Sequence, residues 1–344
     1  MIRIALLLGL AGIALATGLV IYQGLDAIVE ALAVAGIGIL WASLFHVVPM
    51  ALNARAWQVL LPRGERPSLS FFAWAVWVRE AVNGLLPVAR IGGEVASARL
   101  LFRAGIETGP AVASLVVDMT LCVATQFVFT VAGLALLLRR TDDAAAVGGV
   151  ALGLAVSVPL VAALLVVQRV GLFGLLAKLF RAMFGSRFDG LVGGAATLDA
   201  AVRALYARRA GLASCTVWQL VAWAAGAGEI WLALRYLDHP VDIADALAIE
   251  ALIQAVSSAA FVVPSAIGVQ EVGFFVLGGA VGLTHEVALA LALARRARDV
   301  IVFVPALIAW QLVEGRLWWR GRYRGGGLGS PSSAGSTKSV QPRV

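Results

Sequence analysis

Four charged residues interrupt the last long apolar segment of the chain, 286–313. They are Arg295, Arg296, Arg298 and Asp299. In a membrane helix this position is near mid-depth, where each ionised side chain costs about 2.5–3.5 kcal/mol or more. Arg295 and Asp299 are four residues apart and can pair on one helix face. The other arginines then need anions, and the candidates are Glu271, Glu250, Glu229 or a ligand phosphate.

A comparable set of charges lies in the first half of the chain. It consists of Arg79, Glu80, Arg90, Glu94, Arg99 and Asp118. For any one of these residues, an equally good interpretation is a paired charge that holds helices together. Taken together, the two arginine-bearing regions favour a site for a lipid headgroup. The predicted substrate-binding residues are therefore the six above with Glu271, Arg295, Arg298 and Asp299.

The charges accompany two similar helix-breaking motifs. "PVARIGGE" at 87–94 and "PSAIGVQE" at 264–271 both place Glu seven residues after Pro, with Ala and Gly between. Proline and glycine interrupt helices, and the backbone groups they free cannot face lipid. Such breaks must be buried in protein or line a wet cavity. The predicted hinge residues are Pro87, Gly92, Gly93, Pro264 and Gly268.

Each motif ends in the first turn of a short helix that carries a glutamate. Glu94 and Glu271 therefore lie where free N–H groups and the positive end of the helix dipole favour an anion. Each carboxylate is either a cap for its own helix or a proton-binding group for coupled transport. The sequence leaves both roles open.

These residues must be positioned by membrane-spanning helices. Six apolar segments are long enough to cross a core of about 30 Å; they lie at 4–22, 37–60, 111–138, 145–167, 212–235 and 286–313. The segment 4–22 also resembles a secretory signal, but it continues past the Ala-x-Ala site to spanning length. The apolar stretches 71–86 and 245–262 end in Pro and Gly, which predicts re-entrant hairpins over 71–104 and 245–283. The fold class is thus an all-α polytopic membrane protein, with six spans and two hairpins or eight segments in total.

The two motifs indicate an internal repeat. The same offset that relates the motifs relates 105–106 to 282–283, and one more helical turn relates Asp118 to Asp299. We expect a first repeat over 1–138 and a second over 139–320. Because the hairpins are entered from opposite sides of the membrane, the repeats are inverted, as in many secondary transporters.

Basic residues predict the orientation in the membrane. They are concentrated in 62–67, in 169–209 and after residue 315, which makes these regions cytoplasmic by the positive-inside rule. Both termini are then cytoplasmic. The segment 170–208 alternates apolar and basic positions and is expected to lie at the cytoplasmic interface. The Gly/Ser-rich tail 321–344 is expected to be disordered.

Composition limits the class of protein and its partners. The chain of 344 residues is 61% hydrophobic and 14% charged, with a mean hydropathy of +0.92, which is typical of a membrane protein. The net charge of +7 is accounted for by the cytoplasmic loops and tail, so no nucleic-acid partner is needed. Three scattered histidines and two cysteines predict neither a metal site nor a cofactor, and His46 is interpreted as a core histidine.

The two motifs and the segments that follow them resemble a known family. "NGLLPVARIGGEVASARLL" and "VPSAIGVQEVGFFVLGGAVGL" followed by "ALALARRARDVIVFVPALIAW" resemble the flippase-like family related to the lysylphosphatidylglycerol synthase transmembrane region. The similarity is greatest to the hopanoid-biosynthesis-associated HpnL subgroup and extends to about residue 320. It implies a multi-pass bacterial inner-membrane protein that translocates lipids. Larger members carry a soluble aminoacyl-transferase domain; we expect none after residue 324, and hence no synthase activity.

The leading hypothesis is a lipid transporter of the flippase type. It would move an anionic or amphiphilic lipid, held by Arg90, Arg295 or Arg298, and the resemblance raises hopanoid metabolism as its setting. Membrane lipids are the expected partners, and a homodimer remains open. The alternatives are a scaffold that recruits lipid-modifying enzymes through 170–208, or an integral-membrane enzyme that uses acidic residues. We expect a protein that is not an enzyme.

Overall fold

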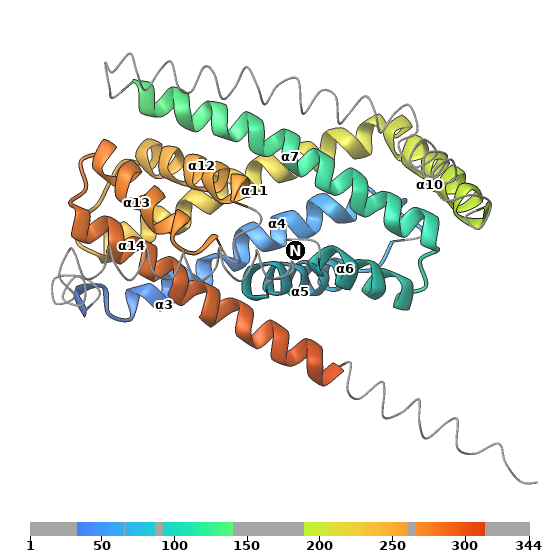
Figure 1. The fold of residues 1–344 in the computed structure, drawn as a ribbon, viewed down its shortest axis with the longest axis horizontal. Helices are drawn as coiled ribbons and strands as arrows, with labels where there is room; N and C mark the ends of the chain where they lie inside the picture. The colour runs from blue at the N-terminus through green and yellow to red at the C-terminus, as the bar shows by residue number, and fades with distance from the viewer. Residues whose placement is uncertain (1–32, 65, 87–91, 140–188, 261–265, 314–344) are drawn as a thin grey trace, which may run out of the picture.

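The computed structural model describes residues 33–64, 66–86, 92–139, 189–260 and 266–313. Within these ranges every regular element is a helix (Figure 1). In chain order they are α3 (Gly38–Phe45), α4 (Val47–Gln58), α5 (Leu69–Leu85), α6 (Gly92–Arg103), α7 (Thr108–Leu138), α10 (Asp189–Ala207), α11 (Arg209–Tyr236), α12 (Ile243–Ala259), α13 (Val269–Ala280), α14 (His285–Arg298) and a π-helical turn, η3 (Asp299–Phe303). The α-helix resumes over 304–313.

Several described helices have the length and composition of membrane spans. Gly38–Gln58, Thr108–Leu138 and Arg209–Tyr236 are apolar enough to cross a bilayer, and they coincide with three predicted spans. The predicted span 286–313 is helical throughout, from α14 through η3 to residue 313. Because it contains Arg295, Arg296, Arg298 and Asp299, it is less apolar than the three helices above. The predicted spans 4–22 and 145–167 lie outside the described residues. The all-helical membrane fold is confirmed.

Two of the long helices change geometry next to a proline. Between α3 and α4 the helix is interrupted at His46, because Pro49 has no amide hydrogen to donate to the Phe45 carbonyl. In the last helix the π turn η3 precedes Pro305, which cannot donate to the Ile301 carbonyl. Both irregular turns therefore follow from sequence, and both lie beside charged side chains.

The two stretches predicted as hairpins each contain a pair of helices, and the Pro/Gly motifs between them lie partly outside the described residues, at 87–91 and 261–265. The first is α5 with α6, and the second is α12 with α13. In Figure 1, α12 lies along α7, whereas α5 lies beside the last helix. The α5 side chain of Trp77 donates a hydrogen bond of 2.7 Å to the carbonyl of Val302. Each hairpin thus packs against the long helix that belongs to the other half of the chain.

Small residues allow the helices to approach closely, while the outer surface remains apolar. A Cβ atom at Gly133 of α7 would overlap Ala251 of α12, which is the close packing that small residues permit in membranes. Facing outward, Val128, Val217 and Ile308 are each more than half exposed. An apolar exterior of this kind suits a lipid environment.

Part of the predicted interfacial segment 170–208 is described. Its second half forms α10, which packs against α7, and Arg208 at its end donates a hydrogen bond to the Leu60 carbonyl. The first half of this segment and the tail 321–344 lie outside the described residues. So do the predicted site residues Arg90, Pro87 and Pro264.

Candidate functional site

The buried charges form two groups between the helices. The first charged cluster contains Arg79, Glu94, Asp118 and Gln219. The second charged cluster contains His46, Glu80, Glu229, Glu250, Glu271, Arg295, Arg296, Arg298 and Asp299. Asp118 and Arg295 each lie about 15 Å along their helices from the first helical residue, half of a core of about 30 Å. Both clusters therefore lie well inside their helices rather than at the helix ends.

Arg79 of α5 is the centre of the first charged cluster. Its guanidinium donates to Asp118 Oδ2 at 2.8 Å and lies 3.9 Å from Glu94 Oε2. The other Asp118 oxygen accepts from Gln219 of α11 at 3.0 Å. The guanidinium also lies 5.2 Å from the ring centroid of Trp57, a cation–π contact. Both Asp118 oxygens are therefore engaged, whereas Glu94 has a side-chain hydrogen bond with Asn83 and only a long contact with Arg79.

The start of α6 holds Glu94 without using it as a cap. The amide of Gly93 donates instead to Asn83 of α5 at 2.8 Å. A Cβ at Gly93 would overlap the Arg79 carbonyl and lie 2.6 Å from Asn83 Nδ2, so only glycine permits this approach. Among the described residues, five buried side-chain atoms have no hydrogen-bond partner: Glu94 Oε2 and Ser97 Oγ here, and Arg295 Nε, Arg296 NH2 and Trp310 Nε1 elsewhere. Positions 94 and 97 share one helix face, so both unsatisfied atoms are presented together.

A bidentate ion pair forms the core of the second charged cluster. Arg295 of α14 donates to the two carboxylate oxygens of Glu250 of α12, at 2.6 and 3.1 Å. Gln254 adds a further hydrogen bond of 2.7 Å to Glu250. Both charged side chains are only 3% exposed, so removing one would leave an uncompensated buried charge. This pair joins α12 to α14.

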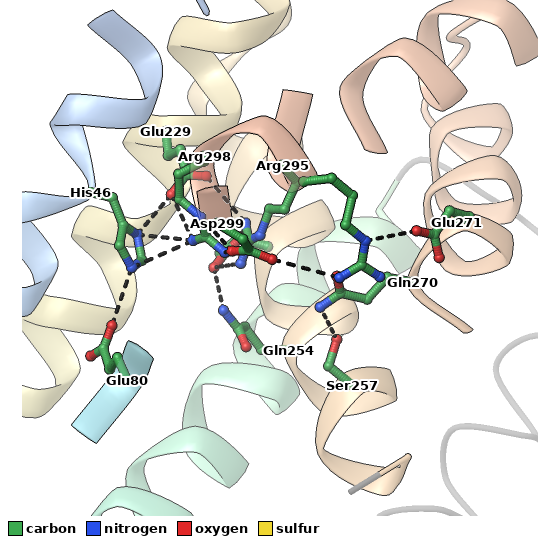
Figure 2. A network of polar contacts seen from close by, with 12 residues as sticks. His46, Glu80, Glu229, Gln254, Ser257, Gln270, Glu271, Arg295, Arg298 and Asp299 are labelled. Carbon is green, nitrogen blue, oxygen red and sulfur yellow. Dashed lines mark hydrogen bonds and ion pairs between the residues drawn. The ribbon is translucent and has the colours of Figure 1, made fainter. Parts of the chain in front are cut away.

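Arg298 connects the last helix to the junction of α3 and α4 (Figure 2). It contacts Asp299 at 2.5 Å, Glu229 of α11 at 3.2 Å and His46 Nδ1 at 3.0 Å. The ring of His46 also reaches Glu229 at 2.9 Å and Glu80 of α5 at 3.3 Å. Groups from both halves of the chain thus meet at His46.

At the second break, Glu271 caps its own helix. It accepts a hydrogen bond of 2.6 Å from the amide of Gly268, the cap residue of α13, whose φ of +81° favours glycine. Its other oxygen accepts from Arg296 at 2.8 Å. Arg296 also lies 3.6 Å from Asp299. Glu271 is therefore satisfied at both oxygens.

The structure brings most of the predicted site residues together, with changes in pairing. Arg295 pairs with Glu250 rather than with Asp299, so that proposed pair is wrong. The named acceptors Glu271 and Glu229 do receive Arg296 and Arg298. Glu80 belongs to the second cluster and not to the first. Arg99 is exposed on α6.

Sequence reasoning gave too small a role to His46, Glu229 and Glu250. The sequence indicates Glu229 and Glu250 as partners for arginine, and Glu229 also as a candidate acid/base group, although carboxylates within apolar helices are themselves a signal of a site. The sequence favours a core histidine at position 46, but His46 contacts two carboxylates and a guanidinium. The proline three residues later was the available signal, because it predicts an irregular turn at this position.

A small, partly open hollow of about 10 Å³, roughly enough for one water molecule, adjoins the second charged cluster between α3, α11 and α14. Its polar lining comes from Ser43, Glu229, Arg295 and Arg298. No group of three or more His, Cys, Asp or Glu side chains in the described ranges is arranged to hold a metal ion. The arrangement can bind polar or charged groups through hydrogen bonds, and it can hold or release protons.

Comparison with known proteins gives one match. The profile described as "Lysylphosphatidylglycerol synthase TM region" matches residues 8–306, which is most of the chain. Neither the curated proteins nor the solved structures gave a significant match.

Proposed function

The chain belongs to the lysylphosphatidylglycerol synthase TM region family, and we propose on this premise that it moves the polar headgroup of an amphiphilic lipid across the membrane. Membership of the family supports an integral membrane protein in lipid metabolism or transport. Our proposal goes one step further, namely that the protein itself moves a lipid.

One observation carries the proposal. Glu94 Oε2 and Ser97 Oγ are buried polar atoms without a hydrogen-bond partner among the described residues. A buried acceptor that lacks a partner costs about 1–3 kcal/mol, and a bound headgroup would remove this cost. Both atoms lie at the start of α6, directly after a Pro/Gly break, where irregular backbone in membrane proteins lines cavities. We assign the headgroup to this place.

The surrounding charges favour a headgroup that contains a cationic group. In the two clusters the carboxylates outnumber the arginines: Glu80, Glu94, Asp118, Glu229, Glu250, Glu271 and Asp299 face Arg79, Arg295, Arg296 and Arg298. An ammonium group beside Glu94 would balance part of this excess, and a phosphate would lie towards Arg79. Arg295 and Arg298 are engaged by carboxylates, so we give them a supporting role.

We further propose that the two halves are inverted repeats that move against each other. The similar order of elements, with a broken hairpin before a long helix in each half, supports this view. The crossed packing of α5 on the last helix and of α12 on α7 also supports it. Rocking of one half would expose the headgroup to each side in turn while the acyl tails stay in lipid.

The proposal places the protein in the bacterial inner membrane with both termini in the cytoplasm, as a transporter rather than an enzyme. The distribution of basic residues supports this orientation. The quoted motifs further support the HpnL subgroup and a role in hopanoid metabolism. Comparing hopanoid distribution between the inner and outer membrane in cells with and without the protein tests that setting.

Translocation in proteoliposomes tests the proposal. Vesicles of phosphatidylethanolamine and phosphatidylglycerol would carry a fluorescent analogue of one of three lipids, with a zwitterionic, anionic or cationic headgroup. We expect transfer of the zwitterionic or cationic lipid. Glu94→Gln should slow it by about 10- to 100-fold, since a hydrogen bond to a charged group is worth about 1.5–3 kcal/mol.

The control is Glu107→Gln, which changes an exposed glutamate just before α7 in the same half. It should transfer lipid at the wild-type rate. Absence of transfer by the wild-type protein for all three analogues would overturn the proposed function. Normal transfer by Glu94→Gln would remove Glu94 from the site.

A further inference from the structure

Several helices meet at His46. It lies in the irregular turn between α3 and α4, and its side chain is 13% exposed. The charged groups that face it are Glu80 from α5, Glu229 from α11, and Arg298 with Asp299 from the last helix. The ring of Phe303 in η3 packs edge-on against it at 5.8 Å. This buried imidazole has no role in the headgroup site proposed above.

The contacts at Nδ1 of His46 cannot all form in one protonation state. Glu229 Oε2 lies 2.9 Å and Arg298 NH1 lies 3.0 Å from this nitrogen. A carboxylate needs a proton on Nδ1, whereas a guanidinium can only donate and so needs a bare nitrogen. Glu80 lies 3.3 Å from Nε2 and accepts a hydrogen bond from a protonated Nε2 in either state.

Two alternative states therefore follow. In the neutral ring the proton is on Nε2 and points to Glu80, while Nδ1 accepts from Arg298. In the protonated ring Nδ1 donates to Glu229, and the N–H group of Arg298 faces another N–H group at hydrogen-bond distance. Arg298 must then withdraw from the ring towards Asp299, which it already contacts at 2.5 Å.

Withdrawal of Arg298 affects the packing of the last helix. Arg298 contacts both α11 and the junction of α3 and α4, and Arg295 adds a weaker ion pair with Glu229 of α11 at 3.9 Å. It directly precedes the π turn, where the regular helical hydrogen bonds are already interrupted. A proton on His46 therefore loosens the last helix at the place where it is easiest to deform.

The hollow beside the second charged cluster has room for about one water molecule next to these groups. Its lining includes Glu229 and Arg298, both of which contact His46. A water molecule there would lie beside Glu229, which is 2.9 Å from Nδ1.

We propose that His46 is a proton-binding site, and that its protonation, by displacing Arg298, releases the last helix for the rocking step of transport. This inference rests on the proposed function for its consequence, but not for the proton site itself. Protonation at His46 and contact of Arg298 with the ring are mutually exclusive.

Histidine NMR tests the proton site without any transport. The chain contains three histidines, so ¹⁵N-histidine labelling of the full chain in lipid nanodiscs gives a simple spectrum. His46→Gln assigns its signals. We expect a bare Nδ1 with a proton on Nε2 at high pH, and protons on both nitrogens at low pH. A ring that keeps one form from about pH 5 to 8, the range in which imidazole titrates, would overturn the proposal.

Proteoliposomes test the coupling. Wild-type transfer of the fluorescent lipid should be about tenfold faster at about pH 5 than at pH 8. His46→Gln keeps a polar group that cannot titrate, so its transfer rate should not change with pH. The matched control, His285→Gln, alters an exposed histidine at the start of α14 and should keep the pH dependence.

The outcomes separate the two proposals. A wild-type protein that transfers no lipid at either pH overturns the proposed function, and the NMR titration then still decides whether His46 binds a proton. A wild-type rate independent of pH, or a pH dependence that persists in His46→Gln, overturns the coupling while leaving lipid transfer intact.

Discussion

The two broken hairpins carry the same residue type at the same place but hold it in different ways. Glu271 accepts from the Gly268 amide and from Arg296, so both oxygens are satisfied. Glu94 leaves the capping of α6 to Asn83, and its Oε2 atom has no hydrogen-bond partner among the described residues. The second break is therefore locked by its glutamate, whereas the first leaves its glutamate available.

The arginines differ as well. In each half an arginine lies between the glutamate of the short helix and the aspartate of the long helix: Arg79 between Glu94 and Asp118, and Arg296 between Glu271 and Asp299. Arg79 comes from α5, before the break, while Arg296 comes from the long helix itself. The glutamate and the aspartate thus pair with an arginine from the hairpin in the first half and with one from the long helix in the second. The ion pairs of the second half are also shorter at the glutamate. We infer that the second hairpin stabilises the protein and that the first binds the headgroup.

The strongest test of this division is Glu250→Gln in the locked half. It leaves Arg295 buried without its bidentate partner, which should cost about 3–5 kcal/mol, measured by thermal or denaturant unfolding in detergent. Replacing both partners, with Glu250→Leu and Arg295→Met, should restore most of the lost stability. If Glu250→Gln unfolds like the wild type, the second cluster is not the stabilising region.

A smaller effect should separate the two glutamates directly. Glu271→Gln weakens its charge-assisted contacts with Arg296 and Gly268, and we expect a loss of about 1.5–3 kcal/mol in unfolding free energy. Glu94→Gln removes a charge that is only loosely paired at 3.9 Å, so stability should stay close to that of the wild type. Equal destabilisation by both substitutions would abolish the comparison.

The smallest effect concerns the packing of the first hairpin. In the second motif the position that corresponds to Gly93 is Gln270, which donates a hydrogen bond of 2.8 Å to Ser257. Gly93 itself lies against the α5 backbone. Gly93→Ala should cost about 1–3 kcal/mol through overpacking, read from the melting temperature. Gly109→Ala, whose new Cβ would meet its nearest neighbour at 3.8 Å, is the control and should be nearly neutral.

Much of the architecture could be predicted from sequence because apolar length and Pro/Gly breaks have direct physical meaning. The acceptors of Arg296 and Arg298 could also be predicted, because buried arginines require carboxylates and the apolar segments contain few of them. The pairing of Arg295 could not be predicted, because a partner within its own helix and one on α12 satisfy the same requirement. The role of His46 depends on helices distant in sequence, α5, α11 and the last helix. A single histidine in an apolar segment does not reveal them.

The adjacent residues Arg79 and Glu80 have a mechanical consequence. Arg79 reaches the first charged cluster and Glu80 reaches His46, because consecutive residues of a helix point in directions that differ by about 100°. Any rotation of α5 about its axis must therefore change the ion pairs near Glu94 and those at His46 in the same movement. Binding of a headgroup near Glu94 and protonation of His46 would then be coupled through α5, by two side chains that are adjacent in sequence.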